Sequence, residues 1–121
     1  MNTALWILQV LLAAVFLAHG LMYLMPPAAI RKTMGEMPFP AGFFRFIGVA
    51  EILAAFGLIL PGWTGILPWL TLLAASGLVI VVGGAVVLHL SRREISEVFV
   101  TATLLVLAAL VAYMRWFVIP L

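Results

Sequence analysis

Four apolar runs, each close to the length of a bilayer crossing, occupy most of the 121-residue chain. About 20 mostly apolar residues cross the hydrocarbon layer of a membrane as a helix. Hydrophobic residues make up 67% of this chain and charged residues only 8%, too few to cover a water-soluble globule. The pattern therefore predicts an all-α membrane protein, a four-transmembrane-helix bundle with short loops, and excludes soluble enzymes and disordered tails.

Proline, glycine and charged residues bound the expected spans. The spans cover residues of about 4–24, 43–60, 66–90 and 95–113, all within one domain of residues 1–121. Pro61 and Gly62 are expected to end the second span, so that a link of residues 61–65 joins the second and third spans as an antiparallel hairpin. Residues 28–34 are expected to form two short amphipathic turns on the membrane surface. A signal peptide is the alternative for the first run, but no Lys or Arg precedes it.

The basic residues predict an orientation in the membrane. Those in or beside the first and third connections are Arg31, Lys32, Arg45, Arg92 and Arg93, and the other side has Arg115. The positive-inside rule then places these connections in the cytoplasm and both termini outside, in the cytoplasmic membrane of a bacterium or archaeon. An aromatic belt at the outer interface is expected from Trp6, Trp63, Trp69 and Trp116. The excess of basic residues reports topology, so we expect no nucleic-acid partner.

Small residues one helical turn apart predict where the helices pack, because association in lipid depends on close contact. The first, second and fourth spans each contain such a pair: Ala14 with Ala18, Ala50 with Ala54, and Ala108 with Ala112. The third span offers Gly77 and Gly84 on one stripe. We expect these residues to serve ordinary packing within the bundle.

Ionisable residues inside a span need an explanation, because each costs roughly 2.5–3.5 kcal/mol on insertion scales. They are His19, Glu51, His89 and Glu97. Counted from the predicted cytoplasmic helix ends, His19 and Glu51 share a depth of roughly 8–10 Å. Gly48 and Ala55 lie one turn from Glu51 on the same face, which indicates that this face points into the bundle.

Three interpretations of these polar residues follow. The first is a buried hydrogen bond between His19 and Glu51 that fixes helix register, with the arginines reaching the interface. The second is a ligand or proton site, whose candidate residues are His19, Tyr23, Arg45, Gly48, Glu51 and His89. A metal site is not expected, because two histidines at different depths without Cys or Asp fall short of a usual ligand set. Arg45 lies about 240° around the helix from Glu51, so we expect Glu51 to pair with His19.

The stretch Arg45-x-x-Gly48-x-x-Glu51, continuing through Ala54, Gly57 and Leu58 to Leu60-Pro61, resembles the signature of DoxX-like membrane proteins. His89 is similar to a histidine that those proteins often have late in the third helix. The resemblance covers nearly the whole chain. Because the family takes its name from a small subunit associated with thiosulfate:quinone oxidoreductase, it implies a quinone or respiratory link. The chain has no cysteine, so a redox role would need a bound quinone or a partner protein.

Three functions remain. The first is a non-catalytic accessory or scaffold subunit of a larger membrane complex, or a homo-oligomer in the bilayer, since a lone Glu with a lone His lacks the other parts of a catalytic site. The alternative is a site for a quinone-like or other amphipathic molecule around Glu51 and His19 in the inner leaflet, where the pair would exchange a proton. If redox-linked, the chain would act within a quinone-dependent oxidoreductase. A transporter ranks last, because few polar residues lie in the spans.

Overall fold

A computed structural model describes residues 2–120, which are helical along most of their length. The helices are α1 (Asn2–Leu24), α2 (Ala28–Gly35), α3 (Ala41–Thr64), α4 (Leu70–Ser91), α5 (Ile95–Tyr113) and the π-helical turn η1 (Met114–Val118). Within this part of the chain, four helices are long and apolar enough to cross a membrane: α1, α3, α4, and α5 continued by η1. The predicted all-α bundle of four membrane helices is therefore confirmed. The surface segment predicted at residues 28–34 is helical, as α2.

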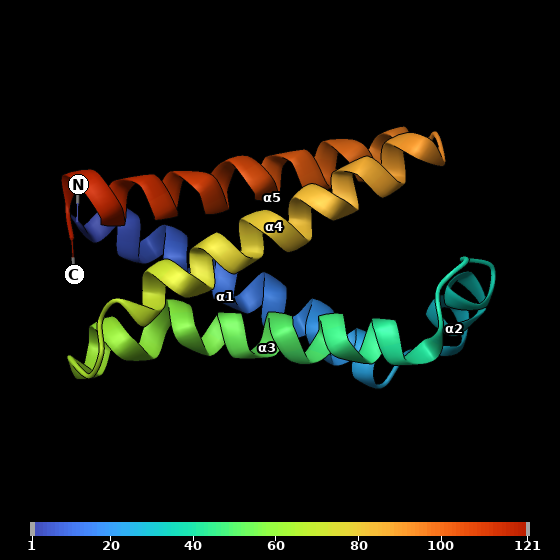
Figure 1. Cartoon of the computed structure of the whole chain (residues 1–121), viewed down its shortest axis with the longest axis horizontal. Helices are drawn as coiled ribbons and strands as arrows, with labels where there is room; N and C mark the ends of the chain where they lie inside the picture. The colour runs from blue at the N-terminus through green and yellow to red at the C-terminus, as the bar shows by residue number, and fades with distance from the viewer. Residues whose placement is uncertain (1, 121) are drawn as a thin grey trace.

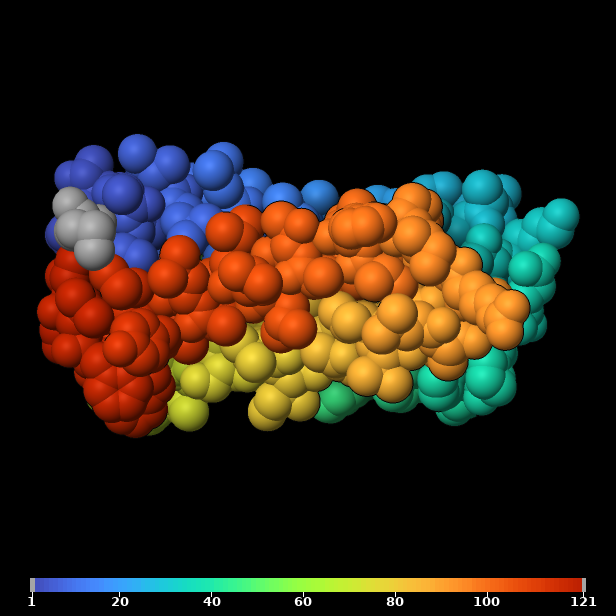
Figure 2. All heavy atoms as spheres, turned by 90° about the horizontal axis from the view of Figure 1, so that it is seen from above, coloured from blue at the N-terminus to red at the C-terminus, as the bar shows by residue number. Residues whose placement is uncertain are grey.

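The four long helices form two antiparallel pairs, α1 with α3 and α4 with α5, and the pairs meet mainly where α3 packs on α4 (Figure 1). The termini and the link between α3 and α4 lie at one end of the molecule. The helix α2 and the turn between α4 and α5 lie at the other end, and the space-filling view shows the same elongated arrangement (Figure 2). This is the alternation predicted for the connections. The basic residues of α2 and of the α4–α5 turn share one end, opposite Trp63, Trp69 and Trp116.

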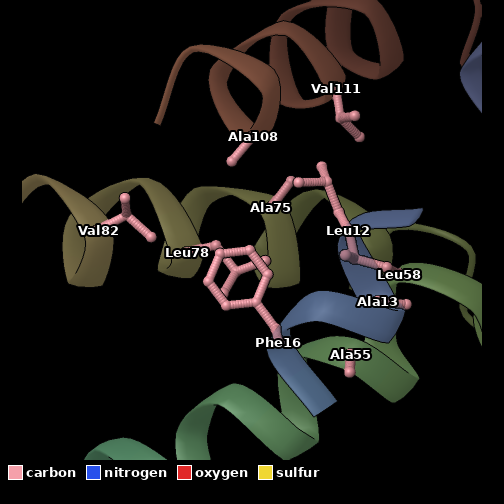
Figure 3. Close-up of a cluster of buried hydrophobic side chains, with 10 residues drawn as sticks. All are labelled: Leu12, Ala13, Phe16, Ala55, Leu58, Ala75, Leu78, Val82, Ala108 and Val111. Carbon is pink, nitrogen blue, oxygen red and sulfur yellow. The ribbon is translucent and has the colours of Figure 1, made fainter. Parts of the chain in front are cut away.

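A core of small and branched apolar side chains lies where the four helices approach one another (Figure 3). Its buried members are Leu12, Ala13 and Phe16 of α1, Ala55 and Leu58 of α3, Ala75, Leu78 and Val82 of α4, and Ala108 and Val111 of α5. Leu58, Ala108 and Val111 are fully buried. Because every long helix contributes, this core holds the two antiparallel pairs together.

The second span is longer than predicted, because α3 runs through Pro61 and ends at Thr64. The prediction that Pro61 ends the helix was therefore wrong. Gly65 ends it instead: its φ of 74° is left-handed, and its N–H donates to the Pro61 carbonyl. The link is residues 65–69 rather than 61–65; Leu67 within it has a left-handed φ of 47°, and α4 begins at Leu70.

Pro61 is tolerated inside α3 because another helix takes over the hydrogen bond that it cannot make. A proline nitrogen has no hydrogen to donate to the carbonyl four residues earlier, here that of Gly57. The hydroxyl of Thr71 in α4 donates to that carbonyl at 2.9 Å, and Thr71 is fully buried. This bond satisfies the freed carbonyl and joins α3 to α4 near the link.

Replacing Thr71 with valine is expected to cost about 1–2 kcal/mol of unfolding free energy, because the Gly57 carbonyl then lies buried without a donor. The variant Pro61→Ala supplies the matched background, since an alanine N–H at position 61 can bond that carbonyl within α3. In this background we expect Thr71→Val to cost distinctly less. Unfolding in mixed detergent micelles measures all four proteins, and an equal cost in both backgrounds would show that the proline explanation is wrong.

The closest backbone approach lies between α1 and α3, at Gly20 and Gly48. A Cβ at Gly20 would lie 2.7 Å from the Gly48 carbonyl oxygen, and a Cβ at Gly48 would lie 2.9 Å from the Gly20 carbonyl oxygen. The prediction that Ala14 and Ala18 form the α1 contact was wrong, because both are exposed. A periodicity of small residues does not show which face of a helix meets its neighbour.

Candidate functional site

A cavity of about 360 Å³ lies between the two helix pairs, in the half of the molecule nearer α2. Residues from all four long helices line it, together with Met37 and Phe39 from the segment between α2 and α3. Most of the lining is aliphatic and aromatic. The polar side chains in it are few: His19, Tyr23, Glu51, His89 and Thr101. An apolar chamber with a few convergent polar groups is the usual form of a small-molecule site.

Glu51 is the acidic side chain in the cavity lining, and its relative exposure is 3%. One of its oxygens, Oε2, lies 2.5 Å from Nδ1 of His19. The Gly20–Gly48 contact explains the pairing, because it brings α1 and α3 close together one residue from His19 and one turn from Glu51. The side chain of His19 is 44% exposed, so this ring remains open on the side away from Glu51.

Aromatic rings continue the cavity wall from His19 toward α2. The rings of Tyr23 and His19 lie 4.3 Å apart between centroids, and Tyr23 meets Phe44 edge-on at 5.8 Å. Phe39 and Phe43 stack at 4.7 Å beside them. Offset and edge-to-face contacts of this kind are favourable and hold rings in defined orientations. The wall therefore offers flat apolar surface directly beside the polar pair.

His89 lines the cavity from α4 and has its own carboxylate partner. Its Nδ1 lies 3.1 Å from Oε1 of Glu94, and Nε of Arg92 donates to the same oxygen at 3.0 Å. The hydrogen bond to His89, followed by that from Arg92, lowers the pKa of the Glu94 carboxyl from its usual value. Glu94 was not among the site residues predicted from the sequence. The feature that could have identified Glu94 is its position five residues after His89, on the other side of the helix end.

The structure brings four of the six predicted ligand residues into this cavity: His19, Tyr23, Glu51 and His89. Gly48 instead packs against the backbone of α1. Arg45 is exposed and does not line the cavity, and within residues 2–120 it makes no ion pair with Glu51. Glu97 is also exposed and accepts a hydrogen bond from Ser96. The expected pairing of Glu51 with His19 is thus present, while their role in binding stays a prediction.

A second polar cluster lies at the other end of the bundle, around Arg115. This side chain is 1% exposed, although the sequence indicated only an outer charge. Its Nε donates to Oε1 of Gln9 at 2.8 Å, and its Nη1 donates to Oδ1 of Asn2 at 2.8 Å. The amide of Gln9 in turn donates to the Leu58 carbonyl at 2.6 Å. The cluster therefore ties α1, α3 and η1 together at the end that carries the termini.

The apolar core separates this cluster from the cavity. Gln9 and Glu51 lie on opposite sides of the layer that contains Leu12, Ala55 and Leu58. The side chains of this layer are packed and buried, so the two polar regions do not merge into one wet path. The cavity is therefore closed on the side that faces the apolar core.

The chain was compared with protein-family models, curated proteins and solved structures. The family model described as the DoxX-like family matches residues 7–111, a stretch that includes every polar residue of the cavity. No curated protein and no solved structure matches the chain.

Proposed function

This chain belongs to the DoxX-like family and has four helices suited to the membrane, and we propose that it is an accessory subunit that binds a quinone-like molecule. The site is the cavity beside Glu51. The observation that carries the proposal is the chamber of about 360 Å³ in which a buried carboxylate, paired with His19, meets an aromatic wall. This volume lies within the range of roughly 300–1,000 Å³ that is common for small-molecule sites.

The lining matches the chemistry of an amphipathic ring compound. Tyr23, Phe39 and Phe44 supply flat apolar surface for a ring. The exposed side of His19 can accept from a hydroxyl group, or donate to a carbonyl when the ring carries both protons, and the second oxygen of Glu51 can accept from a hydroxyl group. Such a division between apolar walls and a few polar groups fixes the orientation of a ligand.

Proton exchange is the chemistry that the pair itself supports. Glu51 and His19 share one hydrogen bond, so a proton taken from a ligand hydroxyl by His19 leaves an imidazolium beside a carboxylate. His19 is also the more exposed partner, which gives the proton a route to water. Electron transfer would need a second redox centre, and we therefore place that centre in a partner protein of a larger membrane complex.

The test is thermal unfolding in mild detergent with and without a short-chain ubiquinone analogue, at matched detergent concentration. At a hundredfold excess over the dissociation constant, the analogue should stabilise the wild type by about 2.7 kcal/mol. We expect Glu51→Gln and His19→Ala to lose most of this stabilisation. Glu97→Gln, which removes a carboxylate outside the cavity, should retain it.

An alkyl chain of the same length without the ring controls for partition into the micelle. If the analogue and the alkyl chain stabilise every variant equally, the cavity does not bind a quinone-like molecule. In that case, lower stability of Glu51→Gln and His19→Ala without ligand would assign the pair to helix register. The accessory role would then rest on partner proteins recovered by gentle purification.

A further inference from the structure

Two histidine–carboxylate pairs reach the cavity through their histidines, one from α1 and α3 and the other from the end of α4 and the turn that follows it. His19 lies in α1 and Glu51 in α3. His89 lies in the last turn of α4, and Glu94 lies in the turn that follows this helix. In both pairs the histidine lines the cavity and the contact is made through Nδ1. Two elements unrelated in sequence thus present the same arrangement to one chamber.

The shared use of Nδ1 decides what each ring can offer a ligand. An ionised carboxylate only accepts hydrogen bonds, so a histidine that contacts one through Nδ1 carries its proton on that nitrogen. In a neutral imidazole the other nitrogen, Nε2, then has no hydrogen and is an acceptor. A carboxylate behind a histidine is also a common way to hold one tautomer and one ring orientation.

We infer that the two histidines accept hydrogen bonds from two hydroxyl groups at opposite ends of an apolar ring, so that the cavity selects the hydroquinone form over the quinone. A hydroquinone has a donor at each end of its ring, whereas a quinone has only acceptors there. His19 and His89 receive the two hydroxyls, and Glu94 is the positioning residue that orients His89. The inference rests on the proposed function and specifies its ligand.

Arg92 strengthens the second pair. Its Nε donates to the same Glu94 oxygen that contacts His89. This cation favours the ionised form of Glu94 and thereby keeps that oxygen an acceptor. The α4–α5 turn therefore fixes the tautomer of a ring that reaches into the cavity.

The test compares three probes of one shape at pH 8 without oxygen: a short-chain ubiquinone, its hydroquinone kept reduced, and the dimethyl ether of the hydroquinone. The ether keeps the ring and removes both donors. We expect the wild type to bind the hydroquinone about tenfold more tightly than the ether or the quinone, as two neutral hydrogen bonds would give. Dissociation constants from titration of intrinsic fluorescence or from calorimetry measure the ratio.

The variants His89→Ala and Glu94→Gln should bring the ratio of hydroquinone to ether binding close to the value for one hydrogen bond, about threefold. They should still bind the quinone, because the apolar and aromatic walls that contact its ring are unchanged. Glu97→Gln should keep the wild-type ratio. A variant that is merely less well folded would bind all three probes more weakly and keep the ratio between them. The ratio therefore reports the hydrogen bond that an oriented His89 makes to the ligand.

The outcomes separate this inference from the proposed function. Equal binding of the quinone and the hydroquinone by the wild type would overturn the inference and leave the quinone site standing. An unchanged ratio in both His89→Ala and Glu94→Gln would also overturn it. Failure of all three probes to bind the wild type would overturn the proposed site together with its selectivity.

Discussion

Replacing Gln9 with leucine is expected to destabilise the protein by about 3 kcal/mol. Gln9 is fully buried and serves two partners at once, accepting from Arg115 and donating to the Leu58 carbonyl. Leucine leaves the Nε–H of the guanidinium without its acceptor in a site that is 1% exposed. A buried charge that loses a partner keeps its full desolvation cost.

A double variant distinguishes the lost hydrogen bond from lost packing. In Gln9→Leu/Arg115→Met the buried charge is gone together with its acceptor, so we expect the double variant to be more stable than Gln9→Leu alone. Thr103→Val serves as a control, because the Thr103 hydroxyl is exposed and bonds only within its own helix. Unfolding in mixed micelles gives the free energies of the wild type, Gln9→Leu, Arg115→Met, the double variant and the Thr103→Val control. If the losses of unfolding free energy from the two single changes add up to that of the double variant, the charge at Arg115 does not explain the importance of Gln9.

Replacing Gly20 with alanine is expected to cost about 1–3 kcal/mol by overpacking the contact between α1 and α3. The new Cβ would lie 2.7 Å from the Gly48 carbonyl oxygen, which is backbone and cannot rotate away. The helices must then separate. Because His19 precedes this contact, the separation should also lengthen the hydrogen bond to Glu51 and weaken the stabilisation by a quinone analogue.

Gly84→Ala is the matched control for this change. Gly84 is also a helical glycine that lines the cavity region, but a Cβ there would meet nothing within 4 Å. Since alanine is the better helix former, Gly84→Ala should be neutral or stabilising by up to about 1 kcal/mol. Similar losses in Gly20→Ala and Gly84→Ala would show that glycine is needed for backbone freedom rather than for close approach.

Much of the architecture follows from composition and spacing. A chain of four apolar runs separated by charged breaks cannot fold as a water-soluble globule. The number of membrane helices and the alternation of their ends can therefore be predicted. The pairing of His19 with Glu51 was also predictable, because two costly polar groups at one depth lower their cost by meeting. The family resemblance found in the second span is confirmed by the match over residues 7–111.

Other features depend on how the helices are rotated about their axes, which the sequence leaves open. The burial of Arg115 needs Gln9 and Asn2 to face it from more than a hundred residues away. Thr71 compensates for Pro61 only because α4 presents that hydroxyl to α3, and this allows α3 to continue through the proline. Gly20 and Gly48 form the close contact between α1 and α3, rather than Ala14 and Ala18 on α1, because the glycines lie on the faces that meet.

The four membrane helices and the polar pair in one half of the bundle could be predicted from the sequence, because the hydrocarbon layer imposes length and apolarity on every span. The position of His89 across the cavity from this pair, with Glu94 as its carboxylate partner, follows from the packing of the helices and could not be predicted. In the sequence His89 and Glu94 both lie near a helix end. Nothing in the neighbouring residues specifies which cavity wall His89 reaches. That wall is set by the packing of α3 on α4, a contact between distant side chains.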